Sequence, residues 1–242
     1  MSNFTDFIGG GGDSVEELFD LLNTAGVTGS QIDTFSNTPQ GQAAWAQTGF
    51  LPDSVVNTQT LMEGIAASSV VMNIVISSSG MMGSVVASST AMTAVAASST
   101  AMTILAASST AMNLVIASST AMNLVIASST AMTALYTAST KWVDDTLGWK
   151  GGSSNAQGVK FTGIGLLVRV TTLTSLWSSG NDGSGANTMG VWLDGTLSAF
   201  GTVVHAYPTT PNEVWTNPAP VKFNSTLGTN FYHGHELAYI PL

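Results

Sequence analysis

Two histidines close together in the sequence are the first residues whose types and spacing could support chemistry. His233 and His235 are two positions apart, and on a β-strand this spacing places both side chains on one face. With His205 and Glu236 they could form a metal site. The ligand spacings typical of zinc sites are absent. The sequence therefore predicts no bound metal and no other cofactor, and it leaves His233 and His235 as weak candidates for metal ligands.

Carboxylates offer a second kind of chemistry, the hydrolysis of glycosidic bonds, which needs two carboxyl groups about 5 to 9 Å apart. The candidates are Asp182 and Asp194, with Asp144 and Asp145 before them. Asp182 lies among Gly, Ser and Asn residues, where aspartate commonly forms turns. The chain also has neither a Gly-x-Ser-x-Gly elbow nor a phosphate-binding loop. We therefore expect that the protein is not an enzyme.

Aromatic residues beside turn-rich segments indicate a binding surface. Sugar-binding sites combine an apolar platform with a few well-placed polar groups, and such combinations occur in the C-terminal third of the chain. Trp192, in contrast, is expected to lie in a hydrophobic core. The residues predicted to contact a receptor are Trp177, Asn181, Asp182, Tyr207, Trp215 and Tyr232.

Residues 155–242, which must position these side chains, have the pattern of a β-rich head. Short segments of strand composition alternate with clusters of Gly, Asn, Asp and Pro. Short strands separated by turns predict a β-sandwich or a β-barrel. Residues 141–154 are interpreted as a neck before this head. The expected strands are 159–161, 165–174, 190–193, 199–207 and 238–242.

Residues 61–140 carry a ten-residue repeat. Met recurs eight times at this spacing, an aliphatic residue follows three positions later, and a serine pair precedes most copies. Between Glu63 and Lys141 the array contains no Asp, Glu, Lys, Arg or His, so its apolar side must be buried against neighbouring repeats or other copies of the chain. The predicted trimer core consists of Met62, Met72, Met82, Met92, Met102, Met112, Met122 and Met132 with Val95, Leu105, Val115 and Val125.

The conformation of the repeat follows from its period. Ten residues leave a helical stripe about 80° out of phase, so a continuous coiled coil fits poorly. Val, Ile and Thr suit a β-type, triple-stranded shaft. Ala and Met favour helix, and the serine before each copy is a good N-cap. We favour short two-turn helices, each restarted at a serine and wound around symmetry mates, with the β-type shaft as the competing arrangement.

Charge is scarce and unevenly distributed in this sequence. Five Lys and Arg face 14 Asp and Glu, and 8% of residues are charged, against about 25% in typical soluble domains. The net charge of −9 argues against binding to nucleic acid or to an anionic membrane surface. Serine and threonine clusters interrupt every apolar stretch, so membrane insertion is not expected. The absence of cysteine excludes disulfides and thiolate metal sites.

Residues 1–60 precede the repeats and are interpreted as an attachment region. Phe4, Phe7 and Ile8 come before the glycines at 9–12. An apolar peptide followed by a flexible glycine linker predicts docking to a partner. Ser14 begins a predicted helix that Gly26 ends, and a second short helix is expected at 42–47. This region would therefore form a helical adaptor.

The repeated Ser-Ser-Thr-Ala-Met-x-x-Val pattern resembles the shafts of tail-fibre and related virion-fibre proteins of tailed bacteriophages. The resemblance covers residues 60–140, and Phe-Thr-Asp-Phe-Ile-Gly-Gly-Gly-Gly at 4–12 is similar to the start of such fibres. It implies a homotrimer on the virion surface, with its N-terminus bound to other virion proteins and its C-terminus facing a host-surface molecule. It transfers no receptor and no binding residue to the head.

The predicted architecture is a fibrous α+β homotrimer with an attachment region (1–60), a shaft (61–140), a neck (141–154) and a β-sandwich or barrel head (155–242). The expected function is that of a bacteriophage virion fibre subunit whose head attaches to the host surface, to a glycan in particular. The alternatives are a single-chain repeat solenoid of adhesive or ice-binding type, and a tail-associated polysaccharide hydrolase.

Overall fold

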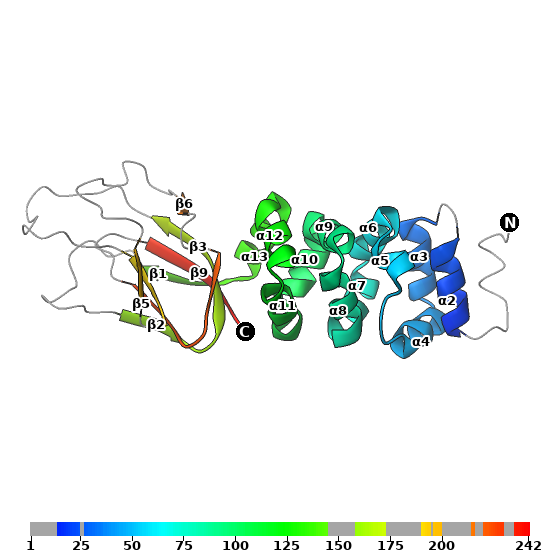
Figure 1. The fold of residues 1–242 in the computed structure, drawn as a ribbon, viewed down its shortest axis with the longest axis horizontal. Coiled ribbons are helices and arrows are strands. Elements are labelled where there is room, and N and C mark those ends of the chain that lie inside the picture. Colours follow the sequence, from blue (N-terminus) through cyan, green and yellow to red (C-terminus); the bar gives the residue numbers. More distant parts are fainter. Residues whose placement is uncertain are drawn as a thin grey trace, which may run out of the picture. The chain divides into compact units, whose positions relative to one another are not determined.

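Helices and strands occupy different parts of the chain in the computed structural model (Figure 1). The structure describes residues 14–24, 27–144, 158–172, 190–194, 196–199, 214–215, 220–229 and 235–242. The chain divides into two units, Met1–Leu135 and Tyr136–Leu242. The described part of the first unit is helical and that of the second is built mainly of antiparallel strands, which confirms the α+β class.

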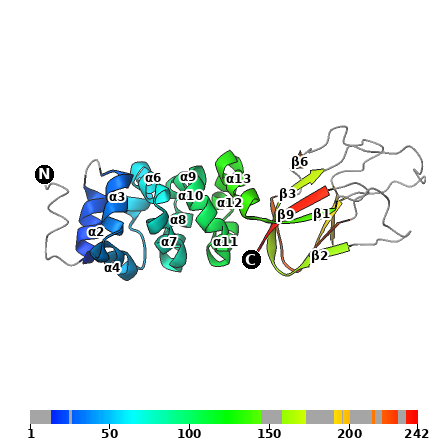
Figure 2. The same ribbon diagram turned by 180° about the vertical axis from the view of Figure 1, so that it is seen from behind.

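The helices of the first unit are short and follow one another closely. Twelve are present in the described part of the chain (Figures 1 and 2). Their bounds are α2 (Ser14–Asn23), α3 (Gly29–Ser36), α4 (Pro39–Gln47), α5 (Asp53–Val56), α6 (Gln59–Ala67), α7 (Ser69–Ser77), α8 (Ser79–Ala87), α9 (Ser89–Ala97), α10 (Ser99–Ala106), α11 (Ser109–Ala117), α12 (Ser119–Ala127) and α13 (Ser129–Ala138).

Each helix from α7 to α13 begins immediately after a serine that caps it. The hydroxyl oxygen of this serine accepts a hydrogen bond from the backbone N–H three residues later, at 3.2 or 3.3 Å, in all seven cases. Such a bond satisfies one of the backbone donors that a helix leaves free at its start. The prediction of short helices restarted at serine caps is confirmed, and the competing β-type shaft is wrong for these residues.

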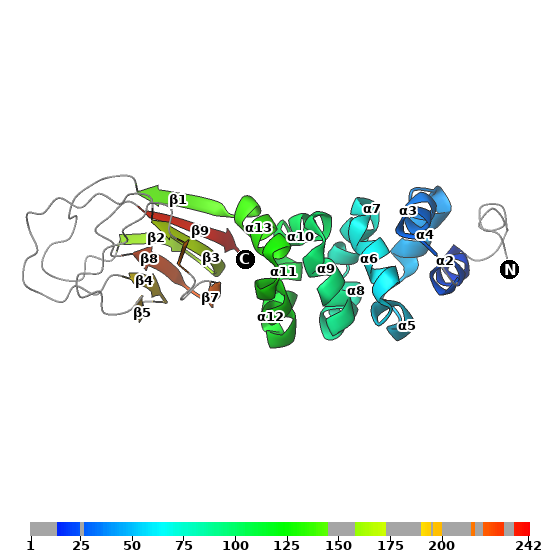
Figure 3. The same ribbon diagram turned by 90° about the horizontal axis from the view of Figure 1, so that it is seen from above.

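Consecutive helices of the array turn sharply at the capping serines. The axes of α6 and α7 differ by 98°, those of α8 and α9 by 102°, and those of α10 and α11 by 106°. Helices three apart along the chain pack on one another from α3 to α12. Thus α6, α9 and α12 lie in succession (Figure 3), as do α7 and α10, and α8 and α11. The repeats therefore form a solenoid from a single chain.

A second hydrogen bond from the capping serines joins successive turns of the solenoid. The hydroxyl of Ser98 donates to the carbonyl oxygen of Ala66 at 2.6 Å, and that of Ser128 to Ala96 at 2.5 Å. Ser88 donates in the same way to Val56 at 2.7 Å. Each acceptor lies in the last turn of a helix, where carbonyl groups have no partner within the helix. One hydroxyl group therefore pairs with a free N–H at the start of one helix and with a free carbonyl at the end of another.

The solenoid core repeats three positions of each copy. In α9 these are Ala91, Met92 and Val95, and all three side chains have 0% exposure. Residues spaced i, i+1 and i+4 lie on one face of a helix. The equivalent residues of α7, α8, α10 and α11 are buried as well, which accounts for the strict recurrence of Met and the aliphatic residue.

The chain itself supplies the surface that buries the predicted trimer-core residues. Six of the methionines are fully buried within one chain, as are the four aliphatic residues named with them, whereas Met122 and Met132 are half-buried. The burial does not require the symmetry mates that the sequence prediction invoked. The homotrimer stays a prediction, and the burial of these side chains no longer supports it. The six are Met62, Met72, Met82, Met92, Met102 and Met112, and the four are Val95, Leu105, Val115 and Val125.

Residues before the repeats belong to the same solenoid. Helix α3 packs on α6, α4 on α7, and α5 on α8, so no boundary separates the predicted adaptor from the shaft. Trp45 is fully buried, and its indole N–H donates to the Ser36 hydroxyl at 2.7 Å. The helix predicted to begin at Ser14 and to be ended by Gly26 corresponds to α2, and the one predicted at 42–47 corresponds to α4.

The strands of the second unit form two antiparallel sheets. One has the order β1-β9-β3-β6, with β7 also paired to β3, and the other has the order β2-β8-β4-β5. The bounds are β1 (Thr140–Asp144), β2 (Gly158–Thr162), β3 (Gly165–Thr172), β4 (Gly190–Leu193), β5 (Thr196–Ala199), β6 (Val214–Trp215), β7 (Val221–Phe223), β8 (Thr226–Thr229) and β9 (His235–Pro241).

One hydrophobic cluster is shared by the two sheets. It combines buried side chains of β3 and β9 with those of β4 and β8, and the ring of Phe223 packs edge-on against that of Phe161 with centroids 5.8 Å apart. The cluster consists of Leu167, Val170, Val191, Leu193, Phe223, Leu227, Leu237 and Tyr239. Lys141–Asp144, which the sequence assigned to a neck, pair with β9 as part of the first sheet.

The double role of the capping serines predicts the effect of removing one hydroxyl. We expect Ser98→Ala to lower the free energy of unfolding by about 1 to 3 kcal/mol, because it removes an N-cap and a bond between turns. Urea unfolding followed by circular dichroism measures this change.

The adjacent Ser99 is exposed and provides a matched control. Ser99→Ala should change stability by less than about 0.5 kcal/mol. Equal effects of the two substitutions would contradict the assigned role of Ser98.

Candidate functional site

The residues predicted to contact a receptor fall largely outside the described residues. This applies to Trp177, Asn181, Asp182, Tyr207 and Tyr232. Trp215 lies in β6, where its backbone pairs with Val170 of β3. For the other five, the structure describes the strand ends between which their segments run.

Those strand ends come together at one end of the second unit. In the first sheet, His235 pairs with Thr172 and with Asp144, and Val214 pairs with Thr171. These residues adjoin the segments that carry Trp177, Tyr207 and Tyr232. The first sheet therefore gathers at one edge the strand ends that flank the predicted receptor residues.

The second sheet has a corresponding edge. Thr229 pairs with Gly158 and Val191, and Gly190 pairs with Ala199. The short turn at Gly163 and Ile164 joins β2 to β3, so the far ends of these two strands lie at the same end of the unit. We call this the connector end. It is defined by the strand ends Asp144, Gly158, Thr172, Gly190, Ala199, Val214, Thr229 and His235.

The opposite end of the second unit is closed by tight turns that Asp194 holds. Its carboxylate accepts hydrogen bonds from the backbone N–H groups of Asn224 at 2.7 Å and Ser225 at 2.6 Å, and from the Ser225 hydroxyl at 3.0 Å. The backbone N–H of Asp194 donates to the carbonyl of Thr226 at 3.0 Å. The residue has φ 54°, a left-handed conformation that aspartate tolerates better than most residues.

The hydrogen bonds at Asp194 also lower the pKa of its carboxyl group. Burial acts to raise the pKa of the carboxyl group, but the bonds from Asn224, Ser225 and Thr226 outweigh it, and the pKa lies below its ordinary value. Asp194 was a candidate carboxylate for glycoside hydrolysis. The structure gives it a role in joining two turns, at the end of the sheets opposite the connector end.

A cluster around Tyr136 is a feature that the sequence prediction missed. The Arg169 guanidinium lies 3.3 Å from the centre of the tyrosine ring and the Lys141 ammonium 4.6 Å, while the phenol donates to Glu236 at 2.7 Å. The Lys141 ammonium also donates to the carbonyl groups of Tyr136, Thr137 and Ser139. The hydrogen bond to Glu236, assisted by burial and by the carboxylate charge, raises the pKa of Tyr136.

This cluster joins the last turn of α13 to β1, β3 and β9 within the second unit. Lys141 is the first cation of the chain and follows directly after a helix, where a positive charge stabilises the unpaired carbonyl groups and the helix dipole. The position of Lys141 after a predicted helix could therefore have indicated, from the sequence alone, a lysine that caps the helix C-terminus. The cluster is structural, because its charged groups are engaged by the ring and by carbonyl oxygens.

Most of the predicted docking residues and histidines lie outside the described part of the chain. Phe4, Phe7, Ile8, His205 and His233 lie outside the described residues, and His235 begins β9. Among the residues that the structure describes, no group of three His, Cys, Asp or Glu is arranged to hold a metal ion. The proposed histidine pair therefore stays a prediction.

No single helix in the described ranges is long and apolar enough to cross a membrane. Three pairs of consecutive helices meet the criterion together by length and composition, although each pair is bent by 98° to 106°. The apolar face of these helices is buried in the solenoid core.

Comparison with known proteins gives no relative from which a function could be transferred. The chain matches no model of a protein family. It also shows no match among curated proteins.

The depressed pKa of Asp194 predicts how the second unit responds to acid. A carboxyl group with a lowered folded-state pKa contributes stability above its unfolded pKa of about 3.9, and this contribution is lost as the pH falls through the folded value. Hydrogen exchange should therefore increase in β4 and β8 on acidification from about pH 5 to about pH 2.

The solenoid and an uncharged variant are the controls for this measurement. Helices α9 to α12 contain no ionisable side chain and should keep their protection. Asp194→Asn should make the second unit less stable at neutral pH and remove this part of its acid sensitivity. A variant as stable as the wild type at neutral pH would contradict the assignment.

Proposed function

We propose that the chain is a subunit of a bacteriophage virion fibre that presents the connector end of its second unit to a host-surface glycan. The observation that carries the proposal is the gathering of strand ends at that end of the two sheets. Segments that connect strands at one end of a β-structure commonly carry binding residues on a rigid framework. The six predicted receptor residues all lie in β6 or in segments that adjoin the connector end.

The solenoid is suited to the role of a spacer. Each ten-residue copy adds one helix that makes the same contacts as the copy before it, so the array lengthens without a change in its construction. Residues 111–120 and 121–130 are identical, as expected of an array that grows by duplication. A spacer of this kind would hold a binding unit away from the particle surface.

In this proposal the subunit forms a homotrimer, its N-terminal region binds other virion proteins, and the particle surface is its location. Three copies would convert a weak contact with a glycan into a strong one through avidity. Val143 is 50% exposed on β1 and Val159 is 54% exposed on β2. Both lie on strands at the edges of their sheets, and they are apolar side chains that a subunit contact would cover.

A second candidate is a monomeric repeat solenoid of adhesive or ice-binding type. The burial of the repeated methionines within one chain favours it, because the array then needs no second subunit. The exposed serine that begins each helix from α7 to α13 gives such a molecule a regular polar surface. The polysaccharide-hydrolase alternative gains no support from Asp194, since that carboxylate holds a turn.

The native mass and the binding of polysaccharides test the proposal together. We expect light scattering coupled to size exclusion to give three times 24.8 kDa for the full chain. We also expect binding to members of a panel of immobilised bacterial lipopolysaccharides and capsular polysaccharides. Trp177→Ala and Trp215→Ala should each weaken this binding by about tenfold or more, as for buried aromatic anchors in other interfaces.

Phe50 of the first unit provides a matched aromatic control, because it is 61% exposed. Phe50→Ala should leave the binding unchanged. A monomer that binds no polysaccharide of the panel would contradict the fibre proposal. Inhibition of ice growth by such a monomer would identify it as the second candidate.

A further inference from the structure

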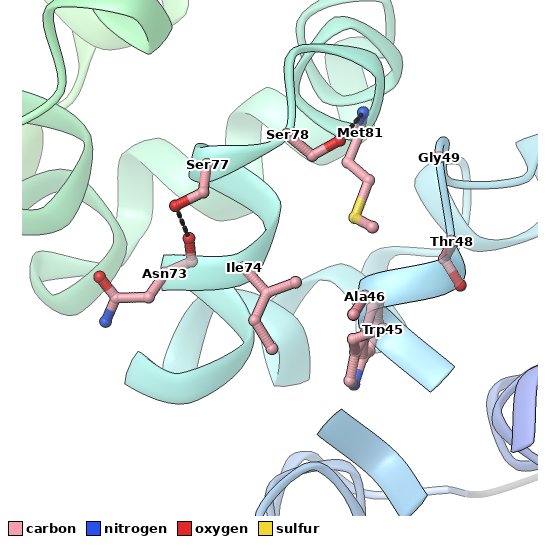
Figure 4. A pocket seen from close by; sticks show the side chains of 9 residues that line it. All are labelled: Trp45, Ala46, Thr48, Gly49, Asn73, Ile74, Ser77, Ser78 and Met81. Carbon is pink, nitrogen blue, oxygen red and sulfur yellow. Dashed lines mark hydrogen bonds between the residues drawn. The ribbon is translucent and has the colours of Figure 1, made fainter. Parts of the chain in front are cut away.

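An open, solvent-facing cavity of about 500 Å³ lies in the first unit between α4, α7 and the start of α8 (Figure 4). Small-molecule sites in proteins have volumes of about 300 to 1,000 Å³. The lining combines polar groups with the apolar side chains of Ile74 and Met81, and it contains no ionisable residue. This site lies outside the residues that support the proposed function.

A bond between solenoid turns is absent beside the cavity. The capping serines Ser88, Ser98 and Ser128 donate to the carbonyl 32 residues earlier, whereas among the described residues Ser78, Ser108 and Ser118 do not. The same register would pair Ser78 with Ala46. Both residues instead line the cavity, and among the described residues the Ser78 hydroxyl has no acceptor and the Ala46 carbonyl has no donor.

Departures from the repeat lie next to this cavity. Gly80 replaces the threonine of later copies, and a Cβ atom there would lie 2.0 Å from the carbonyl oxygen of Gly49. Ser84 accepts a hydrogen bond from the Leu51 backbone N–H at 3.3 Å. The segment that follows α4 is thereby held against α8, and the cavity lies beside it.

Two further departures line the cavity itself. Ser77 and Met81 occupy positions at which later copies carry alanine, and both contribute to the lining. Four residues that break the pattern, Ser77, Gly80, Met81 and Ser84, therefore lie in or beside the cavity. The structure of the repeat does not require a serine at position 77, because five following copies have alanine at the equivalent position.

The free polar groups of the cavity include both acceptors and donors. The Asn73 amide donates one N–H to the carbonyl of Ser69 at 2.7 Å and keeps one N–H and its oxygen free. The Ser77 hydroxyl already donates to the carbonyl of Asn73 at 2.6 Å, and that of Thr48 donates to Ala44 at 2.9 Å. Each hydroxyl oxygen can still accept a hydrogen bond, as can the Ala46 carbonyl. Ser78 retains one proton to donate. A matching ligand is neutral, donates several hydrogen bonds and presents an apolar face to Ile74 and Met81.

We propose that this cavity binds a neutral sugar ring. A pyranose supplies several hydroxyl donors, and its C–H groups form an apolar face, whereas a charged ligand would find no counter-ion in the lining. This inference goes beyond the proposed function and does not depend on it, because the site lies in the first unit. It places a carbohydrate subsite on the solenoid.

Saturation-transfer NMR with the full chain tests the proposal, with glucose, galactose and N-acetylglucosamine as probes and glucuronate as the charged comparison. We expect at least one neutral probe to bind at concentrations up to about 50 mM, which corresponds to weak monovalent affinity. Ser77→Ala installs the residue of later copies and should weaken this binding by about two- to tenfold, the effect of one hydrogen bond.

Two further variants separate a loss of binding from a loss of fold. Ala46 is exposed, so Ala46→Trp should fill the cavity and abolish binding while the circular dichroism spectrum is retained. Thr93→Ala removes a similar bond, from a hydroxyl to the carbonyl of Ser89 at 2.8 Å, away from the cavity, and should leave binding intact. Absence of binding by all neutral probes would overturn the proposal, as would a preference for glucuronate or unchanged binding by Ala46→Trp.

Discussion

The hydrogen bonding of the serine that precedes each helix from α7 to α13 is the interaction on which the repeated part of the solenoid depends. The hydroxyl group accepts a hydrogen bond from the backbone of the helix that the serine begins, and in several copies it donates to a carbonyl of an earlier turn. The serine ends one helix, begins the next and fixes their register against the turn below. Alanine would leave unpaired donors and acceptors at each of these points.

The ten-residue spacing follows from this constraint. A helix of two turns is too short to be stable alone, so each copy depends on burial of its Ala, Met and aliphatic face against its neighbours. Bends of about 100° between successive helices turn all these faces toward one core. The result is a surface of Ser, Thr, Asn and Ala without charge, and a core in which methionine fills the space between helices.

The sequence was sufficient to predict the helices, because Ser-Thr-Ala-Met combines a capping residue with strong helix formers. It could not show what buries the apolar face. An array of near-identical copies satisfies the same pattern whether each copy packs on the third copy along the chain or on a symmetry mate. The angle at each serine decides between these arrangements, and composition does not encode it. For the same reason the first helices were predicted as a separate adaptor, although Trp45 and its neighbours continue the solenoid.

In the second unit the strands from 159 to 193 were predicted well, because their composition and flanking turns are distinctive. The role of Asp194 was missed, since its partners at 224–226 are distant in sequence. The cluster of Tyr136, Arg169 and Glu236 likewise brings together residues up to 100 positions apart. The predicted receptor residues were chosen by composition alone, and pairing of the strands showed that their segments adjoin one end of the two sheets.

The formation of the solenoid within one chain is the central claim, and its dependence on protein concentration tests that claim most directly. Far-ultraviolet circular dichroism of the full chain would be recorded over a wide dilution series, with the thermal midpoint measured at each step. Burial of the methionines within one chain predicts a helix content and a midpoint that do not change on dilution. Loss of helix with dilution would contradict the account and would show that the methionines require other subunits for their burial.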